Sequence, residues 1–326
     1  MRKIVTAVSS LVVASSLAFG SSTVAFGFEG QRSFMPPNDL HLQMLTGGLT
    51  EAEFNAVIDR VLSVYQPIFH QFGATLSVDR LWNDTTVNAS ADQPSATNWQ
   101  VHMYGGLARR PEVTADGFAM VLCHELGHHL GGYPYVQDWA ANEGQADTHA
   151  VGACAAKIFT ANPRLSAQAL ANLPQNMKDK CDRNRPANER DLCYRTLEAG
   201  KSLADLLAAL GNSTVSFDTP DTSAVTRTNN DHPAAQCRLD TYVAGAMCGN
   251  SKWDYTLIPG KALAHKSMAA QNEAFSHSCA TGDGARPACW FAALTTDPAP
   301  GGDCPLGDPS ICALACQLQP TLPWCN

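Results

Sequence analysis

Three features are scarce in the sequence, and each scarcity excludes a class of protein. No two cysteines are spaced C-x-x-C, so zinc ribbons and thioredoxin-like redox motifs are not expected. Beyond the N-terminus, no apolar run is long enough to cross a bilayer. Lys and Arg number 22 against 30 Asp and Glu, a net charge of -8, and the few basic clusters are interleaved with acids. Because nucleic acids and anionic membranes bind clustered basic side chains, neither is expected as a main partner.

The chain is instead rich in cysteine, and its first residues have the pattern of an export signal. Its 12 cysteines form an even set that is large for a cytosolic enzyme. Residues 1–27 have the pattern of a signal peptide, because Arg2 and Lys3 precede an apolar run that small residues follow. A single membrane anchor is the alternative interpretation. We therefore expect a secreted or periplasmic, disulfide-bonded protein with no membrane span after cleavage.

The rest of the chain divides into three predicted parts. Residues 28–48 form an extended, Pro- and Gly-containing lead-in. Residues 49–248 are expected to form one catalytic domain of the α+β class, with a small antiparallel sheet beside the helices of the active site. Residues 249–326 are predicted to be a loop-rich, cysteine-rich C-terminal extension, because six of the cysteines lie between Cys279 and Cys325.

Capping residues and the helical spacing of apolar residues predict where the helices begin and end. A capping box at Thr50 begins one helix, and Thr114 and Gly131 bound another over 115–130. Further helices are predicted from Asp138 onward and over 166–173, 189–210 and 233–247. Short alternating runs over 74–109 predict the sheet.

The strongest chemical signal is the run His124-Glu125-Leu126-Gly127-His128. Two histidines four residues apart lie on one face of a helix, so both imidazoles can bind one zinc ion. Glu125 projects beside them and can act as general base without binding the metal. The helical wheel directs both histidines toward an expected cleft, opposite an apolar face made of Phe118, Leu122, Leu126 and Leu130.

Two acids in the next predicted helix complete the site. Glu143 and Asp147 are also four residues apart, and a short Gly-Gly-Tyr-Pro turn lets their helix fold back. Glu143 as third ligand leaves the fourth zinc position open, as in catalytic sites. Asp147 is placed to accept the second imidazole proton of a ligand, most simply His124. Taken alone, the two acids would more readily form an exposed acidic face than a metal site.

Three motifs in order resemble the gluzincin metalloproteases. They are HELGHH from His124, EGQAD from Glu143 to Asp147, and His232-Pro233 with Arg238 six residues after the histidine. The set is most similar to the CaaX prenyl proteases and HtpX, which combine H-E-x-x-H, E-x-x-A-D and H-P-x-x-x-x-R, and it also resembles uncharacterised exported bacterial proteins. The membrane helices of the best-known relatives are absent, and the cysteine-rich extension has no counterpart among them.

The resemblance implies a zincin-like fold and a role for each motif residue. His124, His128 and Glu143 would bind one zinc ion, with Glu125 as general base and Asp147 orienting a ligand. His232 and Arg238 would line the cleft and stabilise the oxyanion. From the residues alone, His232 could simply begin a helix, and Arg238 could pair with Asp240.

Other residues near these motifs have simpler interpretations. Tyr242 is more readily structural than catalytic. His129 is expected to be packed, or to support a ligand without binding the metal, and His149 is left without a role. The strand-like run 99–104 could hold an extended peptide by edge pairing.

Cysteine pairing is only partly suggested by the sequence. We expect Cys123 to form a disulfide, but not with Cys154, which an α-helix from Glu143 would place about 16 Å further along its axis. Among the other cysteines, local pairs such as Cys181–Cys193 and Cys279–Cys289 are plausible, and the sequence does not decide the full set of pairs.

The function predicted from these residues is that of an exported zinc metalloendopeptidase. It would hydrolyse a peptide or protein substrate through a zinc-activated water. A non-catalytic zinc-containing binding or adhesion protein, and a zinc hydrolase of cell-wall amides, are the alternatives. An extension that blocks the cleft until it is removed is a further hypothesis. The sequence does not specify an oligomeric state.

Overall fold

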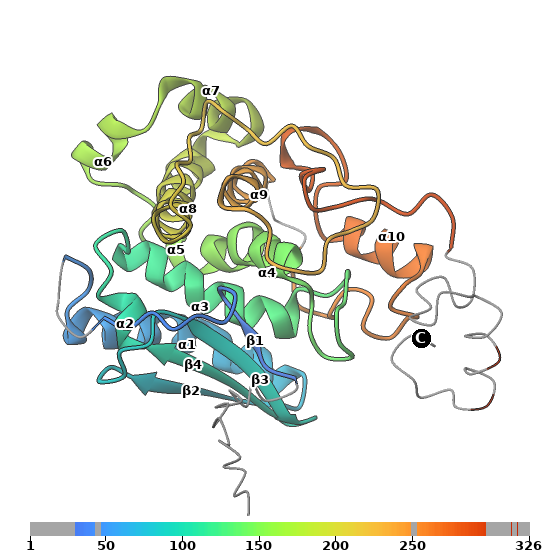
Figure 1. Cartoon of the computed structure of the whole chain (residues 1–326). Coiled ribbons are helices and arrows are strands. Elements are labelled where there is room, and N and C mark those ends of the chain that lie inside the picture. Colours follow the sequence, from blue (N-terminus) through green and yellow to red (C-terminus); the bar gives the residue numbers. More distant parts are fainter. Residues whose placement is uncertain (1–29, 43–46, 249–252, 298–313, 315–317, 319–326) are drawn as a thin grey trace, which may run out of the picture.

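The computed structural model describes residues 30–42, 47–248, 253–297, 314 and 318 (Figure 1). The predicted signal peptide and the last four cysteines lie outside these residues. The strands are β1 (Arg32–Ser33), β2 (Thr75–Leu81), β3 (Ala89–Ser95) and β4 (Asn98–Tyr104). The helices are α1 (Glu51–Gln71), α2 (Gly105–Ala108), α3 (Ala115–Leu130), α4 (Glu143–His149), the π-helix η1 (Ala150–Ala155), α5 (Ala156–Phe159), α6 (Ala167–Asn172), α7 (Gln175–Asn184), η2 (Ala187–Glu189), α8 (Arg190–Leu210), α9 (Ala235–Met247), α10 (Met268–Ser276) and η3 (Gly282–Gly284).

The small sheet has the strand order β1-β3-β4-β2 and is mixed. β1 pairs antiparallel with β3, and β3 pairs antiparallel with β4. The prediction of a purely antiparallel sheet is wrong for β2 and β4, which run parallel. Alternating side chains are found in strands of either direction, so the pattern over 74–109 could not reveal that the β3–β4 hairpin folds back beside β2.

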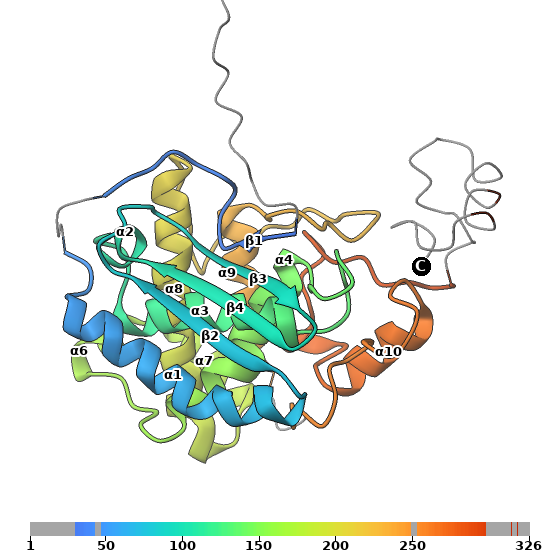
Figure 2. The same cartoon turned by 90° about the horizontal axis from the view of Figure 1, so that it is seen from below.

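The sheet is covered by helices on one face (Figures 1 and 2). α1 packs along β2, and α3 packs beside α1 along β3 and β4. The apolar residues of β4, namely Trp99, Val101 and Met103, are buried, and the residues that alternate with them are exposed or half-buried. Helices α4 and α8 pack against α3, and α9 packs on both of them. α3 is therefore the central helix, and every residue from Gly117 to Leu130 is buried.

Most helices begin and end where their caps predict. Thr50 makes both hydrogen bonds of the capping box of α1, and the Thr114 hydroxyl accepts from Gly117 N at the start of α3. α6, α8 and α9 confirm the helices predicted over 166–173, 189–210 and 233–247. The helix expected from Asp138 begins only at Glu143, because Asn142 provides its N-cap. α7 and α10 were not predicted.

The described part of the chain contains four disulfides. They are Cys123–Cys154, Cys181–Cys193, Cys237–Cys289 and Cys248–Cys279. The local pair Cys181–Cys193 is confirmed, whereas the pair Cys279–Cys289 is wrong. Both of these cysteines instead bind cysteines at the two ends of α9, so residues 253–297 are attached to the helical layer. Trp253, Tyr255 and Ile258 join the main hydrophobic core.

The disulfide between Cys123 and Cys154 corrects the geometric prediction against it. That prediction assumed that the helix from Glu143 runs antiparallel to α3 without crossing it steeply. Both α4 and the π-helix η1 instead pack directly against α3, and the Cα atoms of Cys123 and Cys154 lie 5.6 Å apart.

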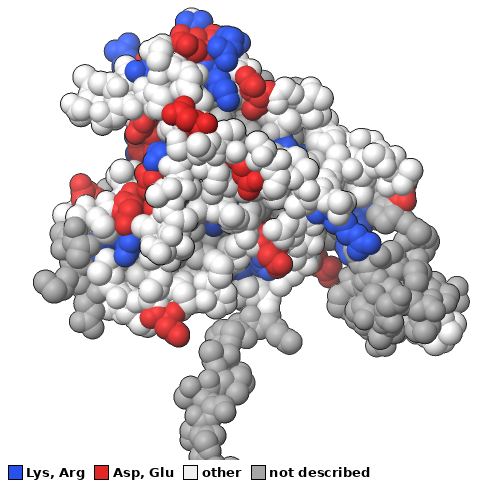
Figure 3. All heavy atoms as spheres, turned by 45° about the horizontal axis from the view of Figure 1, so that its top comes forward, with Lys and Arg blue, Asp and Glu red and all other residues white. Residues whose placement is uncertain are grey.

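The surface carries charges of both signs. On the face in Figure 3, acidic and basic side chains are interspersed and most of the surface is uncharged. Among the described residues, no helix has both the length and the apolar character to cross a membrane.

Candidate metal centre

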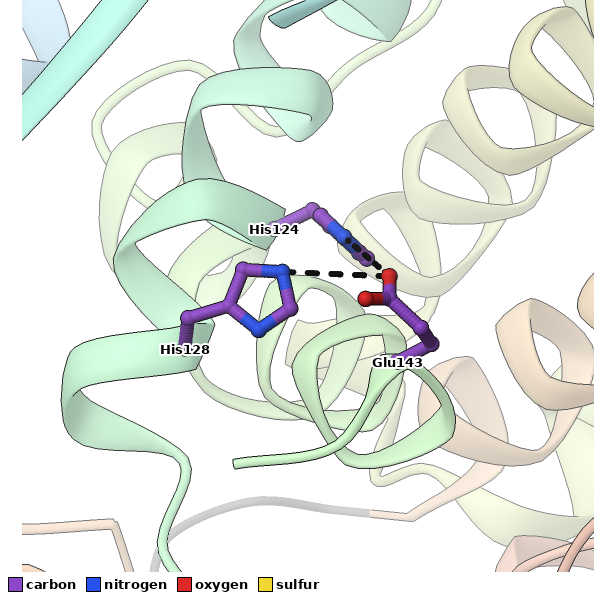
Figure 4. A group of neighbouring side chains, drawn as sticks. All are labelled: His124, His128 and Glu143. Carbon is purple, nitrogen blue, oxygen red and sulfur yellow. Dashed lines mark ion pairs between the residues drawn. The ribbon is translucent and has the colours of Figure 1, made fainter. Parts of the chain in front are cut away.

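The three predicted ligands come from two helices that touch closely. His124 and His128 lie one turn apart on α3, and Glu143 is the first residue of α4 (Figure 4). Ala141 and His128 exchange two hydrogen bonds, Ala141 N to His128 O and His128 Nδ1 to Ala141 O, each 2.9 Å. Gly127 permits the approach, because a Cβ there would lie 2.7 Å from Ala146 O. The returning chain therefore places Glu143 opposite the histidines.

The ligand atoms converge on one point. Glu143 Oε2 lies 3.3 Å from His124 Nε2 and 3.8 Å from His128 Nε2. Two atoms that each bind a tetrahedral zinc ion at about 2.0 Å are separated by roughly 3.3 Å. All three atoms are buried and have no hydrogen-bond partner. Because buried polar atoms are rarely left unpaired, this cluster fits a metal ion.

The opposite edges of both imidazoles are held by acceptors. His124 Nδ1 donates to Asp147 Oδ1 at 2.8 Å, and His128 Nδ1 donates to a main-chain carbonyl. With the proton on Nδ1, each Nε2 presents its lone pair to the common point. Asp147 therefore lies where it can orient the His124 ring, as the sequence predicts.

The charges of the cluster also suit a cation. Burial alone would raise the pKa of Glu143, but the imidazoles of His128 and His124 hold it well below its usual value. Burial lowers the pKa of His128 to about 3, so that imidazole is neutral and available as a ligand. Burial would also lower the pKa of His124, but the Asp147 carboxylate outweighs it and raises that pKa to about 9. A metal ion that bound here at neutral pH would therefore displace a proton from His124.

Asp147 is the centre of a buried network. It accepts from Arg238 Nε at 2.7 Å, Arg238 Nη2 at 2.8 Å and the Tyr242 hydroxyl at 3.1 Å, in addition to His124. Burial would raise the pKa of Asp147, but the guanidinium of Arg238 and then His124 lower it. Arg238 lies on the Nδ1 side of His124, away from the ligand atom Nε2. The structure thus places Arg238 behind a ligand, as the partner of Asp147 rather than of Asp240.

Glu125 is the one carboxylate of the cluster that has no hydrogen-bond partner. Both of its oxygens are buried and unpaired, and burial raises the pKa of Glu125 to about 8. The charges of His124 and Glu143 act on this pKa, so Glu125 lies within electrostatic reach of the ligands.

His232 reaches the site from the loop before α9. Its Nε2 lies 3.4 Å from Glu143 Oε2 and donates to Ser33 O at 2.7 Å. Burial lowers the pKa of His232. His232 therefore sits beside Glu143, with its N–H directed at a main-chain carbonyl.

The residues that sequence reasoning missed come from the predicted lead-in. Arg32 Nη2 forms an ion pair with Glu143 Oε1, and the ring of Phe34 meets the edge of the His124 ring. No motif in residues 28–48 indicated these contacts. The expected open cleft is not seen, because the side chains of His124, Glu125, His128 and Glu143 have no exposed surface.

Several remaining predictions concern neighbours of the site. His129 is packed as predicted, stacked on Trp99 and close to Trp139. His149 is buried and bonded to the Tyr255 hydroxyl at 2.9 Å. The run 99–104 cannot pair with a peptide at an edge, because β4 lies between β3 and β2.

Comparisons with protein-family models, curated proteins and solved structures found no match.

Proposed function

We propose that the chain is an exported zinc-dependent metallopeptidase of the gluzincin type. The observation that carries the proposal is the set of three buried, unpaired ligand atoms, together with the buried, unpaired carboxylate of Glu125, on which the charges of His124 and Glu143 act. Two imidazole nitrogens and one carboxylate are the donor set of a catalytic zinc site with one open position. The four disulfides agree with secretion or a periplasmic location.

Each residue of the cluster has a chemical task in this proposal. His124, His128 and Glu143 hold the metal, which when bound supplies the Lewis acidity that makes water a nucleophile near neutral pH. Glu125 accepts a proton from the attacking water and returns it to the leaving amine. His232 has an N–H near Glu143 that already donates to a peptide carbonyl, as an oxyanion donor must.

The proposal is tested by separating metal binding from turnover. Glu125→Gln should keep stoichiometric zinc and the wild-type melting temperature but lose peptide hydrolysis by a factor of about 10² or more, because the general base is gone. Glu143→Ala should lose zinc. Metal analysis and digestion of a broad peptide library measure both, with Glu112→Gln as the matched control. Full hydrolysis by Glu125→Gln would refute the mechanism.

The complete burial of the site favours a second candidate, a metal-containing binding protein without turnover. Stoichiometric zinc, with no hydrolysis of casein or of purified peptidoglycan, would decide for it. Hydrolysis of peptidoglycan alone would instead identify a cell-wall amide hydrolase.

A further inference from the structure

Residues 32–34, which we call the strap, lie along the outer edge of the sheet and over the metal ligands. Arg32 and Ser33 pair antiparallel with Ala91 and Ser90 of β3, and Phe34 N donates to Ala89 O at 3.1 Å. Figure 2 shows β1 at this edge, beyond β3. The strap is therefore an extended peptide added to an edge strand.

Each strap residue also contacts a residue of the site. Arg32 pairs with the Glu143 carboxylate. Ser33 O accepts from His232 Nε2 at 2.7 Å, and Phe34 O accepts from Arg238 Nη1 at 2.6 Å. Two successive main-chain carbonyls thus use the donors that flank the metal ligands.

These contacts are of a kind that another peptide can make. The β3 pairing and both carbonyl bonds involve only main-chain atoms of the strap, so they do not depend on its side chains. Because the side chains of His124, Glu125, His128 and Glu143 have no exposed surface, a covering segment must move before a peptide reaches them. The strap is followed by the exposed residues 36–40, which favours its movement over that of the buried helices.

We infer that the strap is an intramolecular inhibitor that occupies the place of an extended peptide substrate. A substrate enters by displacing it, pairs with β3 and takes over the hydrogen bonds from His232 and Arg238. This inference rests on the proposed peptidase function. It differs from the hypothesis of a blocking C-terminal extension, because the blocking segment lies at the N-terminal side.

The test is to cut the chain behind the strap. The exposed residues 36–39 are replaced by the recognition sequence of a site-specific protease, and the folded, zinc-loaded protein is cleaved. No cysteine precedes Cys123, so no disulfide retains the released segment. While tethered, the strap has an effective concentration on the order of millimolar, and at micromolar protein it dissociates once cut.

We expect cleavage to raise peptide hydrolysis at least tenfold. Adding a synthetic peptide of residues 28–35 should restore inhibition, and the same peptide with Arg32→Ala and Phe34→Ala should do so more weakly. A variant with a scrambled recognition sequence, treated with the same protease, is the control. Mass spectrometry first establishes that the segment has left the cut protein. If the rate of hydrolysis is then unchanged, the inference is overturned and the peptidase function stays intact. A segment that stays bound at nanomolar dilution would overturn it as well.

A second readout separates failure of the inference from failure of the function. If neither form hydrolyses any peptide, the peptidase function fails. Binding of fluorescent peptide 28–35 to the cut protein then decides about the strap. If an unrelated extended peptide displaces the bound peptide 28–35, the result supports a displaceable strap. If it does not compete, the inference is refuted.

Discussion

At the scale of single residues, Asp147 links the proposed metal ligands to the rest of the fold. Its carboxylate accepts from His124, Arg238 and Tyr242, and it has no exposed surface. Arg238 is almost as deeply buried, so the two charges depend on each other. A buried ion pair of this kind contributes little net stability while intact, but loss of one partner leaves an unpaired buried charge.

Replacing Asp147 by Asn should therefore affect both stability and metal binding. We expect the free energy of unfolding to fall by about 3–5 kcal/mol, because the charge of Arg238 is left uncompensated. Zinc affinity should fall roughly 10- to 100-fold, because His124 loses the acceptor that orients it. Urea unfolding in chelator and zinc competition titration measure the two effects.

Asp116→Asn is the matched control for this change. Asp116 also binds an arginine through both oxygens, Arg195, but its side chain is 22% exposed. Asp116→Asn should lower the free energy of unfolding by less than about 1 kcal/mol. Equal costs at Asp116 and Asp147 would contradict the central role of Asp147.

His149 makes stability depend on pH. Burial lowers its pKa to about 3, below the ordinary value of 6.5. A histidine whose pKa is depressed by folding contributes stability above the unfolded pKa, and this is lost as pH falls from 6.5 toward 3. One such group changes the free energy of unfolding by at most about 1.4 kcal/mol per pH unit.

We expect His149→Gln to flatten the fall in unfolding free energy between pH 6.5 and 4, because Gln keeps a hydrogen-bonding side chain without titrating. Urea unfolding of the metal-free protein at several pH values measures the slope. The exposed His70, changed to Gln, is the control. A slope that persists in full in His149→Gln would show that other groups cause the acid sensitivity.

At the scale of elements, the position of α4 decides the position of Glu143. α4 is held against α3 by the close contact at Gly127 and against residues 286–290 on its other side. A Cβ at Gly144 would lie 2.3 Å from the indole ring of Trp290, which is fully buried. This second contact leaves α4 no room to shift.

Gly144→Ala should consequently lower the free energy of unfolding by about 1–3 kcal/mol, because the added methyl group overpacks the contact with Trp290. It should also lower zinc affinity, because it displaces the helix that carries Glu143. Thermal unfolding and zinc titration measure these effects. Gly152→Ala is the matched control in the adjoining π-helix, since the nearest atom to its Cβ would be 4.0 Å away. For Gly152→Ala we expect the free energy of unfolding to stay unchanged or to rise by about 0.4–1 kcal/mol. Equal losses at both positions would refute the packing argument.

The elements also show what local sequence can and cannot predict. Caps and hydrophobic periodicity were sufficient for α1, α3 and α8, and the i, i+4 spacing was sufficient to group His124 with His128 and Glu143 with Asp147. The parallel β2–β4 pair and the Cys123–Cys154 bond depend on how separate segments pack. The contact of Arg32 with Glu143 joins residues 111 positions apart, and no local pattern records it.

At the scale of the whole molecule, disulfides attach the C-terminal segment to the layer of helices that carries the site. Cys237–Cys289 closes a span of 52 residues and lies next to Trp290, which packs on Gly144. Cys181–Cys193 closes a span of only 12 residues, between α7 and α8. The two bonds should therefore differ in their effect on the site.

Replacing both Cys237 and Cys289 by Ser should lower the free energy of unfolding by about 4 kcal/mol and weaken zinc binding, because the contact on α4 loosens. The corresponding change at Cys181 and Cys193 should cost about 3 kcal/mol and leave zinc affinity unchanged. Unfolding and zinc titration of both double variants check this. Identical zinc affinities in the two would contradict a link between the C-terminal segment and the site.

The close spacing of the ligands along the chain has a consequence for the order of assembly. His124 and Glu143 lie within a stretch of 20 residues, whereas Arg32 and Arg238 come from distant parts of the sequence. Contacts between neighbouring residues form faster than contacts that must close long loops. The two helices that bear the ligands can therefore meet, and accept a cation from the medium, while the chain on either side is still unfolded. The metal would then act as a nucleus for the fold as well as its chemical centre.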